Sequence, residues 1–70
     1  MKPVQSSSIA AYKYDPETQT FSVQFVRAAQ IYDFFEVPES KVKEFEDAES
    51  KGKWFAANIK EKFRFEKRAA

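Results

Sequence analysis

The alternation of hydrophobic and polar residues predicts that the first half of the chain forms β-strands. Phe21, Val23 and Phe25 alternate with more polar neighbours, which is the clearest two-residue period in the sequence. Two further segments are rich in aromatic and β-branched residues, and Pro16 favours a tight turn after the first of them. The strands are expected at residues 9–14, 20–26 and 31–37, joined as an antiparallel meander.

The second half of the chain has the spacing of amphipathic helices. Pro38 ends the third strand and suits the first turn of a helix at residues 38–50, and Gly52 is placed to cap that helix. A second helix is expected at residues 53–63. The hydrophobic stripes are Val42, Phe45 and Ala48 in the first helix and Phe55, Ile59 and Phe63 in the second. We therefore predict an α+β fold of order βββαα, a three-stranded antiparallel meander followed by two α-helices packed on one sheet face.

One domain accounts for the whole chain of 70 residues. We expect a core at about residues 6–65, a flexible N-terminus at residues 1–5 and a basic tail at residues 66–70. Aromatic residues make up 17% of the chain and supply the large buried area that so short a chain needs. No apolar stretch is long enough to span a membrane and no secretion signal is visible, so we expect a cytoplasmic protein, monomeric by default.

The sequence lacks the side chains on which most catalytic and metal sites depend. It has no cysteine and no histidine, and its single glycine excludes a glycine-rich phosphate loop. Four carboxylates cluster between positions 44 and 49, but lysines at positions 41, 43 and 51 lie on either side of them, on what would be the exposed face of a helix. We therefore expect a binding protein rather than an enzyme, with no cofactor and no metal.

Charge and aromatic content point to an anionic partner that stacks on rings. Residues 53–70 carry six basic and two acidic side chains, a net charge of +4. Because two helices cover only one face of a three-stranded sheet, we expect Tyr or Phe rings to be exposed on the other face. A one-residue shift in register would exchange the two faces, so the sequence leaves open which one is covered. Exposed rings beside basic residues are typical of single-strand binders, in which stacking contributes about 1–3 kcal/mol per base.

Two functions remain open at this point. The first is binding of nucleic acid, above all RNA, with tRNA among the candidates. Its predicted contacts are Tyr12, Tyr14, Tyr32, Phe34, Lys53, Lys60, Lys62, Arg64 and Arg68. The second is docking on a larger enzyme of RNA metabolism or transcription, because Trp, Tyr and Arg dominate protein-binding hot spots. Its predicted contacts are Trp54, Arg27 and Tyr32.

Short motifs spread over residues 4–68 resemble the KTSC domain family. They are Ser6-Ser7-Ser8-Ile9, Tyr14-Asp15-Pro16-Glu17-Thr18, Thr20-Phe21-Ser22-Val23-Gln24-Phe25, Ile31-Tyr32-Asp33-Phe34-Phe35-Glu36-Val37-Pro38 and Ser50-Lys51-Gly52-Lys53-Trp54-Phe55, with Ile59 and Phe63. The family occurs at the C-terminus of some lysyl-tRNA synthetases and as free-standing small proteins of bacteria or phages. The resemblance therefore implies the same α+β fold and, from the synthetase context, a role in RNA binding.

The chain departs from the family pattern at three places. The family's Tyr-x-Tyr becomes Tyr32-x-Phe34 here, which removes one hydroxyl. The second turn has Ala28-Ala29 instead of glycines, and Ala56 stands where an Asn often follows the Phe of the second helix. A ligand contact that relatives make through that hydroxyl or amide would not be available to this chain.

Overall fold

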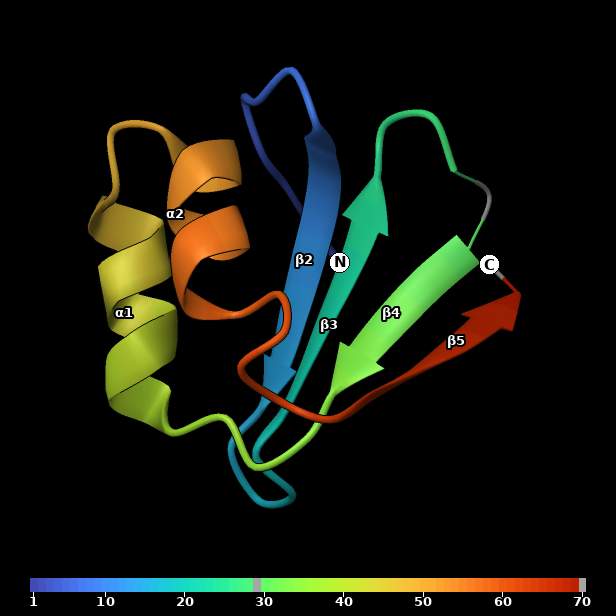
Figure 1. Ribbon diagram of the computed structural model, residues 1–70, viewed down its shortest axis with the longest axis vertical. Helices are drawn as coiled ribbons and strands as arrows, with labels where there is room; N and C mark the ends of the chain where they lie inside the picture. Colours follow the sequence, from blue (N-terminus) through green and yellow to red (C-terminus); the bar gives the residue numbers. More distant parts are fainter. Residues whose placement is uncertain (29, 70) are drawn as a thin grey trace.

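Within residues 1–28 and 30–69, which the structure describes, the chain forms an antiparallel sheet of five strands and two helices. The structure is a computed structural model, shown in Figure 1. The strands are β1 (Lys2–Pro3), β2 (Ile9–Asp15), β3 (Thr20–Phe25), β4 (Gln30–Phe34) and β5 (Phe65–Ala69), and they neighbour one another in this order. The helices, α1 (Glu39–Asp47) and α2 (Lys51–Asn58), lie between β4 and β5 in the chain. The last strand therefore returns from the helices to the edge of the sheet.

The α+β class and the order of a meander followed by two helices are as predicted, but in the described residues the sheet has two more strands than expected. β1 and β5 are the two edge strands, and they occupy the segments that we predicted to be a flexible N-terminus and a basic tail. The prediction missed them because neither has a hydrophobic alternation. β1 is two residues long, and every residue of β5 is exposed. Charged side chains are common in edge strands, where they discourage pairing with other chains.

The register of the central strands brings most of their rings to a single face. Tyr12 on β2 pairs with Val23 on β3, and Val23 in turn pairs with Tyr32 on β4. The next row on this face is Tyr14, Phe21 and Phe34. A register shift between Ile9 and Ala11 adds one residue to β2, so that Ile9 faces the same way as Tyr12 and is 1% exposed.

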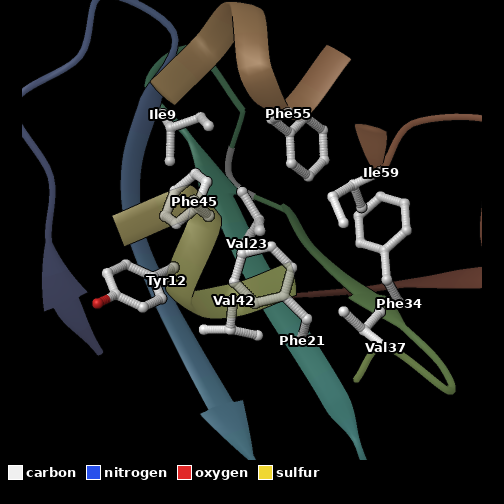
Figure 2. Packing of buried hydrophobic residues seen from close by; sticks show 10 residues of the cluster. All are labelled: Ile9, Tyr12, Phe21, Val23, Phe34, Val37, Val42, Phe45, Phe55 and Ile59. Atoms are coloured by element: carbon white, nitrogen blue, oxygen red, sulfur yellow. The ribbon is translucent and has the colours of Figure 1, made fainter. Parts of the chain in front are cut away.

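The hydrophobic core lies between this face of the sheet and the two helices (Figure 2). Phe45 on α1 is fully buried, and its ring centroid lies 5.1 Å from that of Tyr12 and 5.2 Å from that of Phe21. On α2, the ring centroid of Phe55 lies 5.2 Å from that of Phe34. Thus α1 packs on β2 and β3, and α2 packs on β3 and β4, whereas β5 extends away from both helices (Figure 1).

Both helices are shorter than predicted, and the second ends before most of the basic residues. Ala48 has an extended backbone and ends α1, while Gly52 is the second residue of α2 rather than a cap of α1. The amides of Ile59 and Lys60 both donate to the carbonyl of Phe55 and close α2 in a turn. The second helix predicted at residues 53–63 therefore does not extend through the basic residues that follow position 58, since the residues after this turn lead into β5. No helix in the part of the chain that the structure describes is long and apolar enough to cross a lipid bilayer.

The opposite face of the sheet carries a strip of polar side chains. Ser22 on β3 donates from its hydroxyl to one carboxylate oxygen of Asp33 on β4, with 2.5 Å between the oxygens. Arg68 on β5 donates from Nε to the other oxygen of Asp33, at 2.7 Å. The prediction that Tyr or Phe rings are exposed on the uncovered face is therefore wrong for Tyr32 and Phe34, whose rings lie on the helix side because they share the register of the core residues.

Candidate functional site

A groove of about 480 Å³ lies between α2 and the end of the sheet formed by β4 and β5. Its surface is built largely from the rings of Phe25, Tyr32, Phe34, Phe55 and Phe65. Its other lining residues are Ser8, Gly52, Ala56, Lys60 and Glu61. Cavities of this size and composition hold small organic groups, because the apolar surface favours burial and a few polar groups fix the orientation.

Two of these rings are accessible to a ligand. Tyr32 is partly buried and Phe65 is 44% exposed, and their ring centroids are 5.6 Å apart. Beneath them, the buried ring of Phe34 lies nearly parallel to that of Tyr32, with 6.4 Å between centroids and 17° between planes. Phe65 takes its place because β5 pairs with β4 so that Phe65 lies opposite Phe34. The last strand therefore completes an aromatic surface that β3 and β4 begin.

Basic side chains border this aromatic surface. The Nζ of Lys67 on β5 lies 5.7 Å from the ring centroid of Tyr32, within the range of a cation–π interaction. Lys60 lines the groove, and Lys62 and Arg64 are exposed in the connection that follows it. The sequence analysis named the last three of these residues as contacts and left Lys67 out of that set, because its position above the ring depends on β5 being a strand.

We predicted that Tyr12 and Tyr14 contact nucleic acid, but the hydroxyl of each residue donates a hydrogen bond within the protein instead. Tyr12 is 8% exposed, and its hydroxyl donates to the carboxylate of Glu46 on α1 at 2.5 Å. Burial, together with the hydrogen bond to Glu46 and its negative charge, raises the pKa of Tyr12 to about 12. Tyr14 donates to the backbone carbonyl of Val37 at 2.7 Å, and burial raises its pKa above the ordinary value. Neither ring lines the groove, whereas Tyr32 and Phe34 do.

The serine segment lies beside the groove, next to the start of α2. The Oγ of Ser6 accepts hydrogen bonds from the amides of Ser8 and Ile9, at 3.2 Å each, so the segment turns tightly into β2. A Cβ atom on Gly52 would lie 2.4 Å from the Oγ of Ser8, so glycine permits this close approach of α2 to the serines. Lys53 borders a second hollow formed by these two segments, which shares Ser8 and Gly52 with the groove. Lys53 is thus near the groove without lining it.

Arg68 lies on the other side of the sheet from the groove. Side chains alternate between faces along β5, so Arg68 points away from the face that carries Lys67. Its partner is Asp33, whose carboxylate also accepts from Ser22. Burial raises the pKa of Asp33, but the hydrogen bonds from Arg68 and Ser22 outweigh it and hold this pKa below its ordinary value. The structure therefore separates Arg68 from the other predicted phosphate contacts.

The three residues predicted for protein docking do not form one surface. Arg27, in the turn after β3, and Tyr32 line a shallow hollow next to the groove. Trp54 is partly buried and packs edge-on against Phe45, with 5.9 Å between ring centroids. Trp54 lines neither the hollow nor the groove. The structure thus brings Arg27 and Tyr32 together and leaves Trp54 against the core.

The fold and the groove define a small α+β domain with an aromatic groove beside basic side chains. Residues 5–63 match the family model described as the KTSC domain. The chain belongs to the KTSC domain family.

Relatives of the chain include both longer proteins and single domains. The chain is 41% identical over 66 residues to a lysine–tRNA ligase of a Nostoc species, which covers 94% of this chain and 11% of that protein. It is 38% identical over 64 residues to a protein of Tsukamurella paurometabola, which covers 91% of this chain and 94% of that protein. The crystal structure of a KTSC domain protein from Yersinia pestis superposes with a TM-score of 0.93 at 37% identity, covering 97% and 94% of the two chains. The chain therefore spans about a tenth of the length of the lysine–tRNA ligases that it matches.

Proposed function

We propose that this protein is a non-catalytic RNA-binding module. Its groove takes an unpaired base, and the lysines around the groove contact phosphates. The observation that carries the proposal is the arrangement of Tyr32, Phe65 and Lys67, in which two accessible rings lie 5.6 Å apart and an ammonium group lies 5.7 Å from one of them. A flat ring surface with a cation beside it attracts a base and its phosphate together.

The aromatic surface is suited to single-stranded rather than duplex nucleic acid. Stacking on a ring contributes about 1–3 kcal/mol per base, but it requires a base whose face is free. The groove is a recess of about 480 Å³ between a helix and the sheet, which admits one splayed-out base and not a base pair within a helix. Unpaired loops and ends of RNA present such bases.

The basic residues that remain near the groove determine how strongly binding depends on salt. They are Lys53, Lys60, Lys62, Arg64 and Lys67. If three or four of them meet phosphates, the logarithm of the affinity falls with the logarithm of salt concentration with a slope of about −2 to −3. Similarity to lysine–tRNA ligases, whose name states that they act on tRNA, makes tRNA the first RNA to test.

The test is a fluorescence anisotropy titration of labelled tRNA and of an unstructured oligoribonucleotide, each at two salt concentrations. We expect salt-dependent binding, and we expect Phe65→Ala to weaken it by more than Phe65→Leu, which keeps apolar bulk but removes the ring. Because Phe65 is 44% exposed, neither change should unfold the protein. Absence of salt-dependent binding at micromolar protein would disprove the proposal.

A second candidate function, docking on a protein, is favoured by one observation. Among the described residues β5 is an edge strand, paired with β4 alone, and it borders the aromatic groove through Phe65. An extended peptide could add to this edge and place a side chain in the groove. A pull-down in which a protein partner stays bound after nuclease treatment would support this alternative, whereas loss of all partners would support RNA binding.

A further inference from the structure

Glu61 is the acidic residue among those that line the groove. It lies in the turn after α2, next to Lys60, and both residues line the groove. Within the residues that the structure describes, no lysine or arginine nitrogen lies within 4.0 Å of its carboxylate oxygens, since the salt bridges there are formed by other pairs. The two oxygens are therefore free to accept hydrogen bonds from a ligand.

The backbone of Glu61 is also unusual. Its φ is 70°, in the left-handed region, which is unfavourable for a residue with a side chain and suits Gly or Asn. Gln19 and Glu36 also have positive φ, of 56° and 58°, and at Glu61 the turn is closed by the amide of Lys62, which donates to the carbonyl of Ile59. At position 61 a long acidic side chain is placed where a smaller residue would fit the backbone better. Its place in the lining of the groove, rather than its backbone, therefore distinguishes Glu61 from these two residues.

A carboxylate at this place constrains what the groove can hold. A phosphate group beside Glu61 would be repelled, so within the proposed RNA complex the group that faces Glu61 is the base rather than the backbone. A carboxylate is an acceptor with no proton to donate, so it favours a base edge that carries N–H groups. A base that offers no such group would leave the carboxylate desolvated and unpaired, which weakens binding.

The bases differ in the N–H groups that they present. Guanine carries N1–H and N2–H₂ side by side, a pair that matches the two oxygens of one carboxylate. Adenine and cytosine each offer one amino group next to an acceptor nitrogen, and uracil offers one N–H between two carbonyl oxygens. We infer that Glu61 makes the groove selective for guanine. This inference rests on the proposed function, and a matched bidentate contact of this kind commonly discriminates by about tenfold or more.

The experiment uses four labelled nonauridylates whose central position is G, A, C or U, titrated with the intact protein by anisotropy. We expect the G-containing RNA to bind about tenfold more tightly than the other three. Replacing the central guanosine by inosine, which keeps N1–H but lacks the N2 amino group, should give an intermediate affinity. Equal affinity for all four RNAs would overturn the inference while leaving RNA binding intact, and absence of binding to any of them would overturn both.

Two variants test whether the side chain of Glu61 is the source of the selectivity for guanine. Glu61→Gln should abolish the preference for guanine, because the amide no longer offers two acceptor oxygens. Glu66→Gln removes the same charge from β5 on the opposite face of the sheet, so it should retain the preference. A preference that persists in Glu61→Gln would also overturn the inference, and the wild-type comparison of the four RNAs decides the question even if a variant fails to fold.

Discussion

Tyr12 on β2 donates a hydrogen bond from its hydroxyl to the carboxylate of Glu46 on α1, with 2.5 Å between the two oxygens. The same ring packs edge-on against Phe45 of α1. The side chain therefore joins the sheet to the first helix through both its apolar ring and its polar end. An aromatic residue with a hydroxyl can be buried in this way when a partner lies at the surface of the core.

Replacing Tyr12 by Phe should lower the free energy of unfolding at neutral pH by about 1 kcal/mol, because one hydrogen bond is lost. In the folded protein the pKa of Tyr12 is about 12, above the value near 10 of an unfolded chain. The stabilisation is therefore fully present below pH 10 and is lost as the pH rises towards 12. Denaturation of both proteins from pH 8 to 12 should show the difference between them shrinking over that interval; a constant difference would contradict the assignment.

Replacing Asp33 by Asn should weaken the attachment of β5 to β4. The pKa of Asp33 is held below its ordinary value by Arg68 and Ser22, so its contribution is present above about pH 4 and is lost as the pH falls further. We expect the variant to lose about 1 kcal/mol at pH 7 and to have a flatter pH dependence in acid. Hydrogen exchange should become faster at β5 amides, while amides of β2 and β3 serve as the internal control.

Replacing Phe45 by Ala should cost about 3–5 kcal/mol, because the ring is fully buried between Tyr12, Phe21 and Trp54. That loss is large compared with the total stability of a chain this short, so the variant should be largely unfolded near 37 °C. Phe65→Ala is the matched control, with a cost of about 1 kcal/mol or less for a ring that is 44% exposed. Circular dichroism melts of the two variants test this contrast, and equal melting temperatures would refute it.

Replacing Lys60 and Lys67 together by Ala should reduce the salt dependence of RNA binding. Each phosphate contact to single-stranded RNA contributes about 0.7 to the slope, so the slope should fall by about 1.4 if both lysines meet phosphates. Lys43→Ala, on the exposed side of α1, removes one positive charge away from the groove and should leave the slope unchanged. An equal change in both proteins would mean that net charge, rather than the groove, attracts the RNA.

Gly52→Ala should force the Ser8 hydroxyl to rotate, because the new Cβ would lie 2.4 Å from it. Alanine favours a helix over glycine by about 1 kcal/mol, which offsets the cost of this rotation, so we expect little net change in stability. The same substitution in a Ser8→Ala background no longer meets the Ser8 hydroxyl and should be more favourable by about 0.5–1 kcal/mol. A double-mutant cycle by urea denaturation measures this coupling, and a coupling of zero would mean that the two residues do not touch.

The sequence predicts the strands and helices in which buried residues recur at a regular spacing. Phe21 and Val23 on β3, and Phe45 and Phe55 on the helices, recur at strand and helix spacing because one side of each element faces the core. The two-residue alternation of β2 is interrupted near Ile9, because the register shift turns this residue to the same side of the sheet as Tyr12. Such a shift depends on how β2 pairs with β3, and local alternation does not record it.

The candidate site was harder to predict, because two of its residues come from the edge strand β5. Phe65 and Lys67 stand in a segment with three consecutive charged residues and no buried one, so nothing local distinguishes this strand from a tail. Its pairing with β4 depends on long-range contacts such as that between Arg68 and Asp33. Tyr32 was predicted for the site and lines the groove, whereas Tyr12 was predicted for it and is buried, because the sequence does not say how far along the sheet the helices reach.

The edge position of β5 makes the groove separable from the rest of the molecule. In the described residues, the buried cluster draws on β2, β3, β4, the helices and their connections but not on β5. Peeling β5 from β4 would remove Phe65 and Lys67 and dismantle the groove while the buried cluster stayed assembled. We therefore expect that the domain can lose the proposed binding groove and stay folded, so a spectroscopic signal of folding would not report whether the groove is intact.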